Sequence, residues 1–284
     1  MGRHVLTVTA SKTLFYGTGG VMAQVQHERE RMVGDMAERT GDALPGRLSR
    51  WIALKGILRT LGISWPTVWE TLRGRAHMPT FDARFQGYCQ ALLDDAEIVL
   101  TIAGQANIRP GAIYMSNHQS LYDIPAVGAI VPGIRMVTKA ELFKVPVWGQ
   151  ALKASGFIAI NRRDRIKAIA SLKEAADKML AGTSIWIAPE GTRSRDGQLH
   201  AFKKGGFVMA IETGAVIVPV TIEGTFNVLP PKTAGVSLGQ HVTVRFHPPV
   251  EASRYTLAQR DDLMADVRAA IAGQPGDAQG PSAP

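Results

Sequence analysis

Cysteine is almost absent from this chain, since Cys89 is the single one among 284 residues. One cysteine excludes an internal disulfide framework and is typical of proteins in a reducing compartment. Because a free cysteine in an apolar setting usually packs as a small hydrophobe, we expect Cys89 to be structural and not a nucleophile. His241 and His247 alternate with apolar residues, and no second cluster of ligand types accompanies them. This pattern favours structural roles and predicts no metal site.

Long apolar runs are also missing. No segment reaches the roughly 18 apolar residues that a bilayer span requires, and residues 1–10 lack the sustained apolar region of a secretory signal. We therefore expect no transmembrane span, and a peripheral or monotopic protein on the cytoplasmic face of a membrane. Acidic residues are not in excess either. The chain has 32 lysines and arginines and 24 aspartates and glutamates, which gives a formal net charge of +8.

A positive net charge indicates acidic partners, and the candidates are nucleic acid, anionic lipid headgroups and a phosphorylated substrate. Nucleic acid is the weakest of these, because the basic residues are scattered, exposed aromatics do not interleave with them and no recognised binding motif is present. The charge pattern therefore favours an anionic membrane surface and a phosphorylated ligand, and no nucleic acid.

The composition, 45% hydrophobic and 20% charged, is that of a globular chain. Strand and helix patterns alternate along it, which predicts an α/β fold with a mixed central sheet flanked by helices. We expect strands at 97–103, 111–116, 134–138, 157–161, 184–188, 216–222 and 241–247, and helices at 81–95, 120–130, 147–154, 165–181, 204–213 and 256–272. The expected organisation is an unassigned extension at 1–45, amphipathic helices at 46–80, the main domain at 81–272 and a disordered tail at 273–284.

The segment Leu48–Leu72 predicts two short amphipathic helices, broken near Pro66 because proline favours a new helix start. On the first helix, apolar side chains share one arc, and Lys55 and Arg59 flank it. The arc consists of Trp51, Leu54, Ile57, Leu58 and Leu61, with Trp65 and Trp69 nearby. Such a pattern predicts an interfacial helix on anionic lipid. The alternative is that the same face packs on the protein's own core.

A histidine, His118, precedes an aspartate, Asp123, by five residues. Residues 111–115 predict a buried strand and 121–131 a helix, which places His118 in the strand-to-helix turn. Residues five apart on a regular helix diverge by about 140°, so Asp123 reaches the imidazole only if His118 lies before the helix. This arrangement predicts a general base with its orienting carboxylate. The alternative is that Asn117 caps the helix and both residues are ordinary polar positions.

Three later segments carry groups suited to acyl transfer onto a phosphate-bearing alcohol. They are 156–162, 184–193 and 215–220. The first predicts a strand that delivers Arg162 to its carboxyl end, where α/β sheets place their ligands and where a guanidinium suits phosphate. The second predicts a strand that runs into Glu190 and the turn after it. The third contains Pro219, which removes a ladder donor and indicates an irregular or edge strand.

In this order, the segments resemble the sequence blocks of the lysophosphatidate acyltransferase family, glycerolipid acyltransferases that move a fatty acyl group from a thioester to a glycerol hydroxyl. His118 with Asp123 resembles the first block, and residues 139–146 resemble the segment that follows it in bacterial members. The second, third and fourth blocks resemble 156–162, 190–193 and 216–219. The resemblance covers roughly residues 97–250. Asn161 is a departure, because many members carry an acid before the arginine of the second block.

The resemblance implies a 1-acylglycerol-3-phosphate O-acyltransferase of phospholipid biosynthesis, which esterifies the sn-2 hydroxyl of lysophosphatidic acid and makes phosphatidic acid. Acyl-CoA or an acyl carrier protein thioester would be the co-substrate, without a cofactor and without a covalent acyl-enzyme. His118 would be the base and Asp123 its partner, and Glu190 would either order its turn or contact the acceptor. The expected substrate-binding residues are Lys139, Arg162, Gly191, Thr192, Arg193 and Lys203, with backbone amides around Gly191 as an oxyanion site.

Three alternatives stay open at this point. The acceptor could be another lysophospholipid or a lyso-aminolipid, because the motifs define the chemistry more firmly than the headgroup. A lipid hydrolase would use Ser116 or Ser120 with His118, although neither serine lies in a Gly-x-Ser-x-Gly elbow. A non-catalytic lipid-binding protein would leave the combination of His118, Asp123 and Glu190 unexplained.

Overall fold

The computed structural model describes residues 48–161 and 164–273. The expected extension at 1–45, Arg162 and the expected tail beyond Gly273 lie outside the described residues. No described helix is long and apolar enough to span a bilayer.

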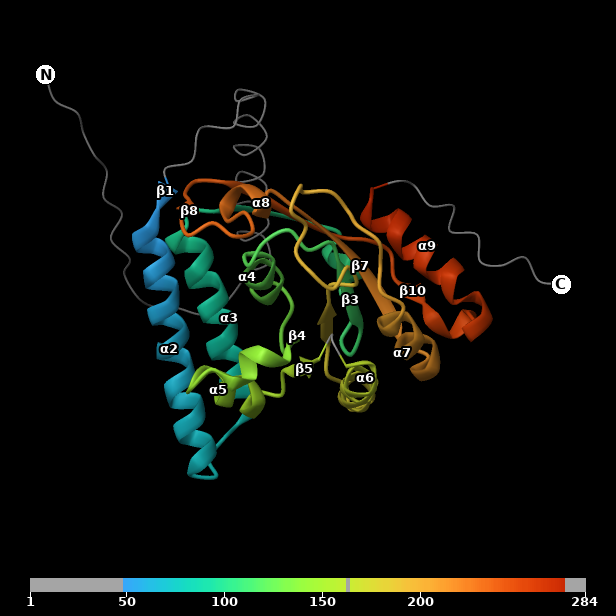
Figure 1. The fold of residues 1–284 in the computed structure, drawn as a ribbon, viewed down its shortest axis with the longest axis horizontal. Coiled ribbons are helices and arrows are strands. Elements are labelled where there is room, and N and C mark those ends of the chain that lie inside the picture. The colour runs from blue at the N-terminus through green and yellow to red at the C-terminus, as the bar shows by residue number, and fades with distance from the viewer. Residues whose placement is uncertain (1–47, 162–163, 274–284) are drawn as a thin grey trace, which may run out of the picture. The chain divides into compact units, whose positions relative to one another are not determined.

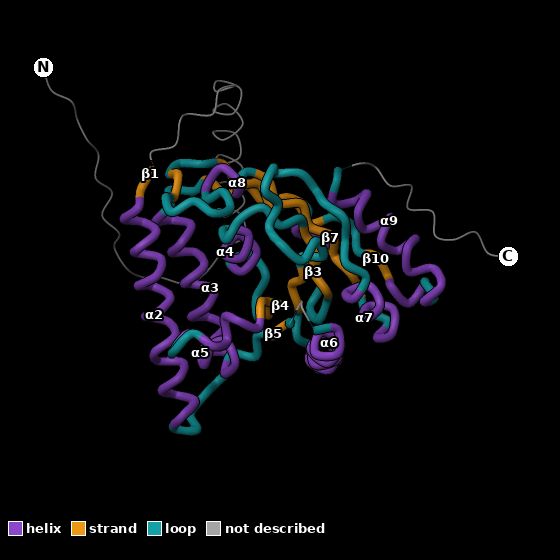
Figure 2. The backbone as a smooth tube through the Cα atoms, viewed as in Figure 1, coloured by secondary structure: helices purple, strands orange, loops and turns teal. Residues whose placement is uncertain are grey.

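The described chain forms an eight-stranded mixed sheet with helices on both faces (Figures 1 and 2). Its strands are β2 (Val99–Ala103), β3 (Ile113–Ser116), β4 (Arg135–Lys139), β5 (Ile158–Ile160), β6 (Ile185–Ile187), β7 (Val216–Glu223), β9 (His241–Phe246) and β10 (Val250–Glu251). Their order is β2-β9-β7-β3-β6-β4-β5, with β10 beside β7. Strands β7, β3, β6, β4 and β5 are mutually parallel, whereas β9 and β10 run antiparallel to β7. The predicted α/β fold and all seven predicted strands are confirmed.

The helices are α2 (Arg50–Leu72), α3 (Met78–Asp95), α4 (Asp123–Gly128), α5 (Trp148–Ala154), α6 (Arg165–Leu180), α7 (Gly205–Thr213), α8 (Thr225–Val228) and α9 (Arg260–Ile271). Short 3-10 turns occupy Gln105–Asn107, Ala140–Lys144, Ala252–Arg254 and Leu257–Gln259, and β1 (Leu48–Ser49) pairs with β8 (Val236–Ser237) outside the main sheet. All six predicted helices of the main domain are present.

Two apolar layers form the core, one on each face of the sheet. Tyr114 of β3 packs into the layer that contains α3 and α4, whereas its neighbours Ile113 and Met115 pack into the layer of α6, α7 and α9. Strand β3 is therefore buried on both faces, which is why its sequence is apolar without alternation. Cys89 is fully buried in the first layer, and this burial raises the pKa of its thiol. The structural role expected for Cys89 is thereby supported.

Pro219 does not lie on an edge strand, because β7 is paired on both sides, so that part of the prediction is wrong. On one side Pro219 lies opposite Met115 of β3. On the other side β9 pairs with β7 from Val220 onward and β10 pairs only at 216 and 217, so the ladder is interrupted at Pro219. Its carbonyl accepts from the N–H of His247 at this interruption. Pro219, which has no N–H to donate, thus lies at a break in the ladder. This agrees with the predicted irregularity of the strand.

Helix α2 is one continuous helix and not the predicted pair. Pro66 lies inside it, and the hydroxyls of Ser64 and Thr67 donate to the carbonyls of residues 60 and 63 around the proline. A proline inside a helix costs about 3 kcal/mol in isolation. Packing of α2 on α3 and α5 offsets this cost, and that packing is not visible in the local sequence.

The apolar stripe of α6 is only partly covered. Leu172 is half-buried and Met179 is buried in the second layer, but Ile166 and Ile169, which share this stripe, are exposed by 81% and 58%. A period of 3.6 residues identifies which side chains share a helix face, but not how far along the helix the sheet extends. The first turns of α6 therefore present apolar side chains to solvent.

Candidate active site

The parallel strands β3, β6 and β4 end at the same edge of the sheet, which we call the carboxyl edge. His118 follows β3, Glu190 follows β6, and Lys139 is the last residue of β4. Strand β4 lies two strands from β3, about 10 Å away at normal strand spacing. These distant segments meet at one edge because all three strands are parallel.

His118 lies before α4, as the spacing argument required. Its Nδ1 is 2.7 Å from Oδ2 of Asp123. Because a carboxylate oxygen only accepts, Nδ1 carries the hydrogen and Nε2 presents its lone pair. The ring stands edge-on to Trp186, with 5.5 Å between the centroids, and 13% of the side chain is exposed. The imidazole is thus held in one orientation and is reachable from solvent.

Asp123 is fully buried and receives four hydrogen bonds. Besides His118, the backbone N–H groups of Gln119 and Ser120 donate to its Oδ2 at 2.8 and 2.9 Å. The hydroxyl of Thr225 donates to Oδ1 at 2.5 Å. A buried carboxylate is tolerated only when such donors replace water. The alternative that Asp123 lies on an exposed first turn is therefore wrong.

Thr225, at the start of α8, is a site residue that the sequence reasoning missed. It is fully buried and follows Gly224, whose φ is +87°. A Cβ at position 224 would lie 2.0 Å from the carbonyl oxygen of His241, so only glycine lets the chain pass β9 closely here. A Gly-Thr pair after a buried strand was the available signal, but it carries no chemistry by itself.

Asn117 does not cap α4. Its side-chain N–H donates to the carbonyl of Ile222 at 2.7 Å, and its Oδ1 accepts from the N–H of Ile222 at 2.8 Å. This pair of bonds fixes the turn that carries His118 to the end of β7.

Ser116 and Ser120 are fully buried, and their hydroxyls are already used as donors. Ser116 Oγ donates to the carbonyl of Asn117 at 2.7 Å and accepts from Trp186 Nε1 at 3.0 Å. Ser120 Oγ donates to the carbonyl of Leu229 at 2.9 Å. Neither hydroxyl is directed at His118, so the geometry does not support a serine hydrolase.

Glu190 is buried behind the turn that carries His118. Its Oε1 accepts from the backbone N–H of His118 at 2.9 Å and its Oε2 from that of His200 at 3.0 Å. Burial raises the pKa of this carboxyl, and the two backbone hydrogen bonds oppose the rise. With both oxygens engaged by the backbone, Glu190 has the geometry of a residue that orders the turn, the first of its two expected roles.

The turn after Glu190 presents a mixed set of groups. The N–H of Gly191 donates to the carbonyl of Ala188 at 3.0 Å, so this amide does not serve the expected oxyanion site. Gly191 has a φ of +76°, and a Cβ there would lie 3.4 Å from the side chain of Lys203, which places Lys203 over the turn. Thr192 is exposed and Arg193 is half-buried in the same turn.

The basic side chains expected to bind substrate are available to a ligand. Lys139 and Lys203 are exposed, and no described residue forms a hydrogen bond or ion pair with the side chain of Lys139, Lys203 or Arg193. Arg162, expected at the end of β5, lies outside the described residues. Within the part of the chain that the structure describes, no group of three or more histidine, cysteine or acidic side chains could hold a metal ion. His247 instead contacts the Thr221 hydroxyl at 2.7 Å.

Comparison with known proteins agrees with this geometry. The model of the Acyltransferase family matches residues 99–223, which include His118, Asp123 and Glu190. The 1-acyl-sn-glycerol-3-phosphate acyltransferase of Borreliella burgdorferi is 31% identical over 176 residues, which are 61% of this chain and 70% of that protein. The chain belongs to the 1-acyl-sn-glycerol-3-phosphate acyltransferase family. This membership confirms the resemblance inferred from the sequence blocks.

Other members of the family match a smaller share of their own length. The chloroplastic enzyme of Arabidopsis thaliana is 34% identical over 57% of this chain and 44% of that protein, and the Escherichia coli enzyme is 36% identical over 55% and 64%. The chain thus spans about half the length of its plant relatives. A crystal structure of the 1-acyl-sn-glycerophosphate acyltransferase PlsC from Thermotoga maritima superposes with a TM-score of 0.63 at 24% identity, over 79% of this chain and 97% of that one. It shows the same fold.

Proposed function

We propose that this protein transfers a fatty acyl group from a thioester to the sn-2 hydroxyl of lysophosphatidic acid and so makes phosphatidic acid. The observation that carries the proposal is the 2.7 Å contact between His118 Nδ1 and the fully buried Asp123 carboxylate at the carboxyl edge. The names of the bacterial and plant relatives support the same acceptor. Another lysophospholipid or a lyso-aminolipid is the competing acceptor that the experiment below addresses.

In the proposed reaction, the acceptor hydroxyl attacks the thioester carbonyl carbon while His118 Nε2 removes its proton. Asp123 stabilises the resulting imidazolium through Nδ1. The tetrahedral intermediate then collapses, the C–S bond breaks, and the leaving thiolate takes the proton from Nε2. The ester and a free thiol are the products, and His118 is neutral again. No acyl-enzyme is required, so the rate depends chiefly on holding alcohol and thioester together.

The acceptor phosphate would lie among the cations beside His118. Arg193 and Lys203 flank the turn after β6, and Lys139 ends β4 at the same edge. We assign these three, together with Arg162 and the exposed Thr192, to the phosphate and glycerol of the acceptor, because charge-assisted hydrogen bonds to phosphate are strong. The donor would be acyl-CoA or acyl carrier protein, and no further cofactor is proposed.

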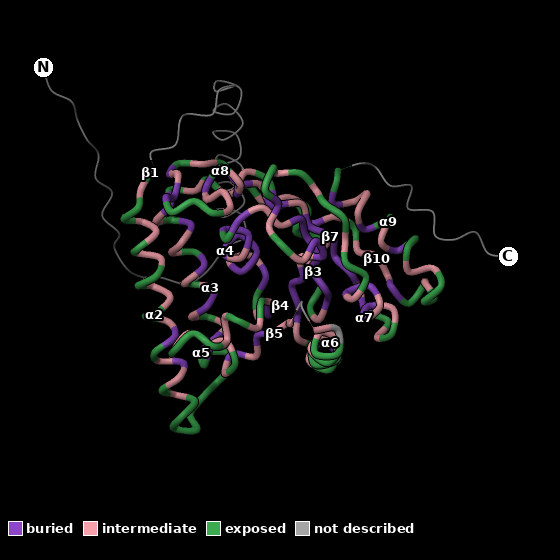
Figure 3. The backbone as a smooth tube through the Cα atoms, viewed as in Figure 1, coloured by how far each residue is buried: buried purple, intermediate pink, exposed green. Residues whose placement is uncertain are grey.

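Helix α2 supports a proposed location on the cytoplasmic face of an anionic membrane. Its apolar residues share one face and remain exposed, for example Trp51 by 64%, Leu58 by 54% and Trp65 by 63%. Figure 3 shows exposed positions along the backbone of α2. Among the described residues, this face does not pack on the protein's own core. Lys55 and Arg59 do not point toward lipid as expected, because both are paired with Asp95 of α3. Electrostatic attraction would have to come from the remaining net positive charge.

A panel assay tests the proposed function. Purified protein is incubated with a labelled acyl thioester and, in parallel, with lysophosphatidic acid, a neutral lysophospholipid, a lyso-aminolipid or water alone. The proposal requires labelled phosphatidic acid as the main product. Preferential acylation of another lyso-lipid would change the acceptor, release of free fatty acid in water would indicate a hydrolase, and binding without turnover would indicate a lipid carrier.

A further inference from the structure

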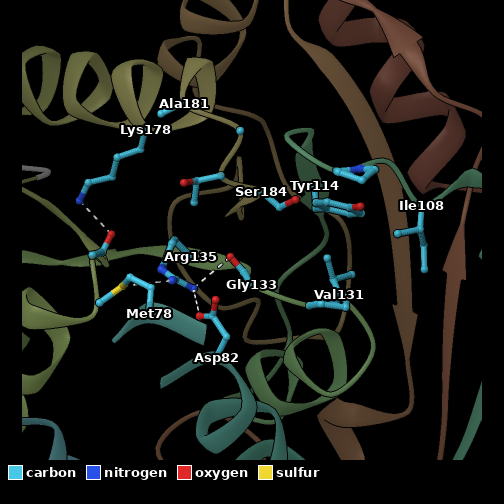
Figure 4. Close-up of a pocket in the computed structure, with 15 residues that line it drawn as sticks. Met78, Asp82, Ile108, Tyr114, Val131, Gly133, Arg135, Lys178, Ala181 and Ser184 are labelled. Carbon is cyan, nitrogen blue, oxygen red and sulfur yellow. Dashed lines mark hydrogen bonds and ion pairs between the residues drawn. The ribbon is translucent and has the colours of Figure 1, made fainter. Parts of the chain in front are cut away.

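A cavity of about 550 Å³ is lined by residues at the amino ends of the strands, opposite the carboxyl edge. Figure 4 shows the residues that line it. Its walls come from the start of α3, the start of β4, the end of α6 and the segment before β6. Apolar groups of Met78, Ile108, Tyr114 and Val131 line much of it. The volume lies within the range of small-molecule sites. His118 is not among the lining residues, so this cavity is separate from the candidate active site.

Arg135, the first residue of β4, is the polar centre of the cavity. It is 6% exposed, and its Nη1 donates to the carbonyls of Gly133 and Ile134 at 3.0 and 3.3 Å. The same Nη1 forms an ion pair with Oδ1 of Asp82, with 2.7 Å between the two atoms. No described donor is aligned for a hydrogen bond to that oxygen. Arg135 therefore spends the oxygen contacts of one terminal nitrogen, Nη1, on the sheet and on Asp82 of α3.

The other edge of the guanidinium faces the cavity without an oxygen partner among the described residues. Nη2 has only the Met78 sulfur, at 3.7 Å, and Nε has no hydrogen bond to a described residue. Nε and Nη2 together form the planar fork that matches the two oxygens of a carboxylate. A buried fork of this kind is costly unless water or a ligand satisfies it.

Lys178 of α6 brings a second cation to the same place. A Cβ added at Gly156 would lie 3.5 Å from Arg135 Nε and 3.9 Å from Lys178 Nζ, so both nitrogens border one small space beside this glycine. Lys178 Nζ donates to the Gly156 carbonyl at 2.9 Å, and its other partner, Glu174, is 53% exposed and does not line the cavity. Among the lining residues, these two cations lie beside the single carboxylate of Asp82, and Glu174 pairs with Lys178 at 2.8 Å from outside the lining.

We propose that this cavity binds a molecule with one carboxylate and an apolar chain, such as a fatty acid. The carboxylate would lie on the Nε and Nη2 edge of Arg135 beside Lys178, and the chain would cover the apolar wall formed by Ile108, Tyr114 and Val131. The two-nitrogen edge of Arg135 matches the two oxygens of a carboxylate, and the apolar wall excludes small hydrophilic acids as good ligands. The site is independent of the proposed acyl transfer.

Calorimetric titration with decanoate tests the proposal, with decanol and inorganic phosphate as comparison ligands. Wild-type protein should bind decanoate at least about tenfold more tightly than decanol, because a charge-assisted fork is lost with the alcohol. Lys178→Met and Arg135→Met should each weaken decanoate by about tenfold or more, whereas Lys173→Met, an exposed lysine on the same helix, should change nothing. Equal binding of decanol, or preference for phosphate, would overturn the assignment.

A diazirine derivative of decanoate then locates the bound chain by crosslinking and peptide mapping. Label on the peptides that contain Ile108 or Val131 is the expected result, and label confined to the peptides around His118 would overturn the proposal by placing the fatty acid in the active site. Circular dichroism monitors folding of each variant. Since Lys178 is partly exposed and Lys178→Met keeps the aliphatic stem, this variant tests the charge even where Arg135→Met leaves Asp82 unpaired and fails to fold.

Discussion

Thr225 donates its hydroxyl hydrogen to Oδ1 of Asp123 at 2.5 Å, across 102 positions of the chain. Both residues are fully buried, so bulk water does not reach this bond. Through this bond, the segment after β7 fixes the carboxylate that orients His118. The hydroxyl is thus a positioning group in the proposed mechanism, although it does not touch a reacting atom.

Replacement of Thr225 tests that role. Thr225→Val keeps the shape of the side chain but leaves Oδ1 without its donor, and we expect kcat to fall about tenfold or more while KM for lysophosphatidic acid stays close to the wild-type value. Thr225→Ser restores the hydroxyl and should recover most of kcat. Steady-state kinetics of the three proteins checks this. An unchanged kcat in Thr225→Val, or a loss that serine does not repair, would show that the residue acts only in packing.

His118→Ala should lower kcat by two or more orders of magnitude, the usual contribution of a general base, with little change in melting temperature. Asp123→Asn should also be severely impaired, since the amide cannot accept all of the N–H groups now aimed at the carboxylate. His241→Ala, on an exposed position of β9, is the control. A folded His118→Ala protein with nearly normal turnover would refute the mechanism.

Arg193→Ala should raise KM for lysophosphatidic acid by about 10- to 100-fold and leave KM for the acyl donor nearly unchanged, because a charge-assisted contact to phosphate is lost. Arg193→Lys should restore part of the affinity. The exposed Arg195, two residues along the same loop, supplies the matched control Arg195→Ala. Initial rates with lysophosphatidic acid and with a phosphate-free monoacylglycerol separate the effects, and equal losses for both acceptors would contradict phosphate binding by Arg193.

Trp51→Glu combined with Leu58→Glu should reduce binding to anionic vesicles by at least about tenfold, because two side chains that would enter the headgroup region become charged. Both residues are more than half exposed, so the melting temperature should change little. Ile166→Glu with Leu180→Glu adds the same charge at exposed apolar positions of α6 and serves as the control. Co-sedimentation with vesicles is the measurement. Equal loss in both double variants would point to net charge alone, and a collapse of the melting temperature would return α2 to the core.

The buried carboxyl of Glu190 should produce a pH dependence of stability. Burial raises its pKa in the folded state above the ordinary value of 4.5, so between these two values the folded protein holds a proton that the unfolded chain has lost. The free energy of unfolding contributed by this group must then fall as pH rises through that window. Compared with Glu190→Gln, the wild type should lose stability as pH increases above 4.5. Denaturant titrations at several pH values measure the free energy of unfolding of both proteins, with the exposed Glu212→Gln as control. If the wild type gained stability relative to Glu190→Gln as the pH increased, the assignment would be contradicted.

Local patterns were sufficient to predict the strands and helices of the main domain and to nominate the groups of the proposed site. The apolar runs of β3, β6 and β7 and the 3.6-residue spacing of the helices reflect burial that each segment needs wherever it packs, so they are legible in the sequence. The pair His118 and Asp123 could also be predicted from the sequence. The short backbone segment between them brings the two side chains together once the helix starts at Asp123.

Long-range packing decided the remainder. The continuity of α2 through Pro66, the pairing of Lys55 and Arg59 with Asp95 and the central position of Pro219 all depend on neighbours that are distant in sequence. The same holds for Thr225, whose hydroxyl reaches Asp123 only because β7 lies beside β3. The sequence by itself determined which groups are available for the proposed acyl transfer. The tertiary structure alone decided which donors hold them in place, since a hydrogen bond of a few ångströms between remote residues exists only after the sheet has brought its strands together.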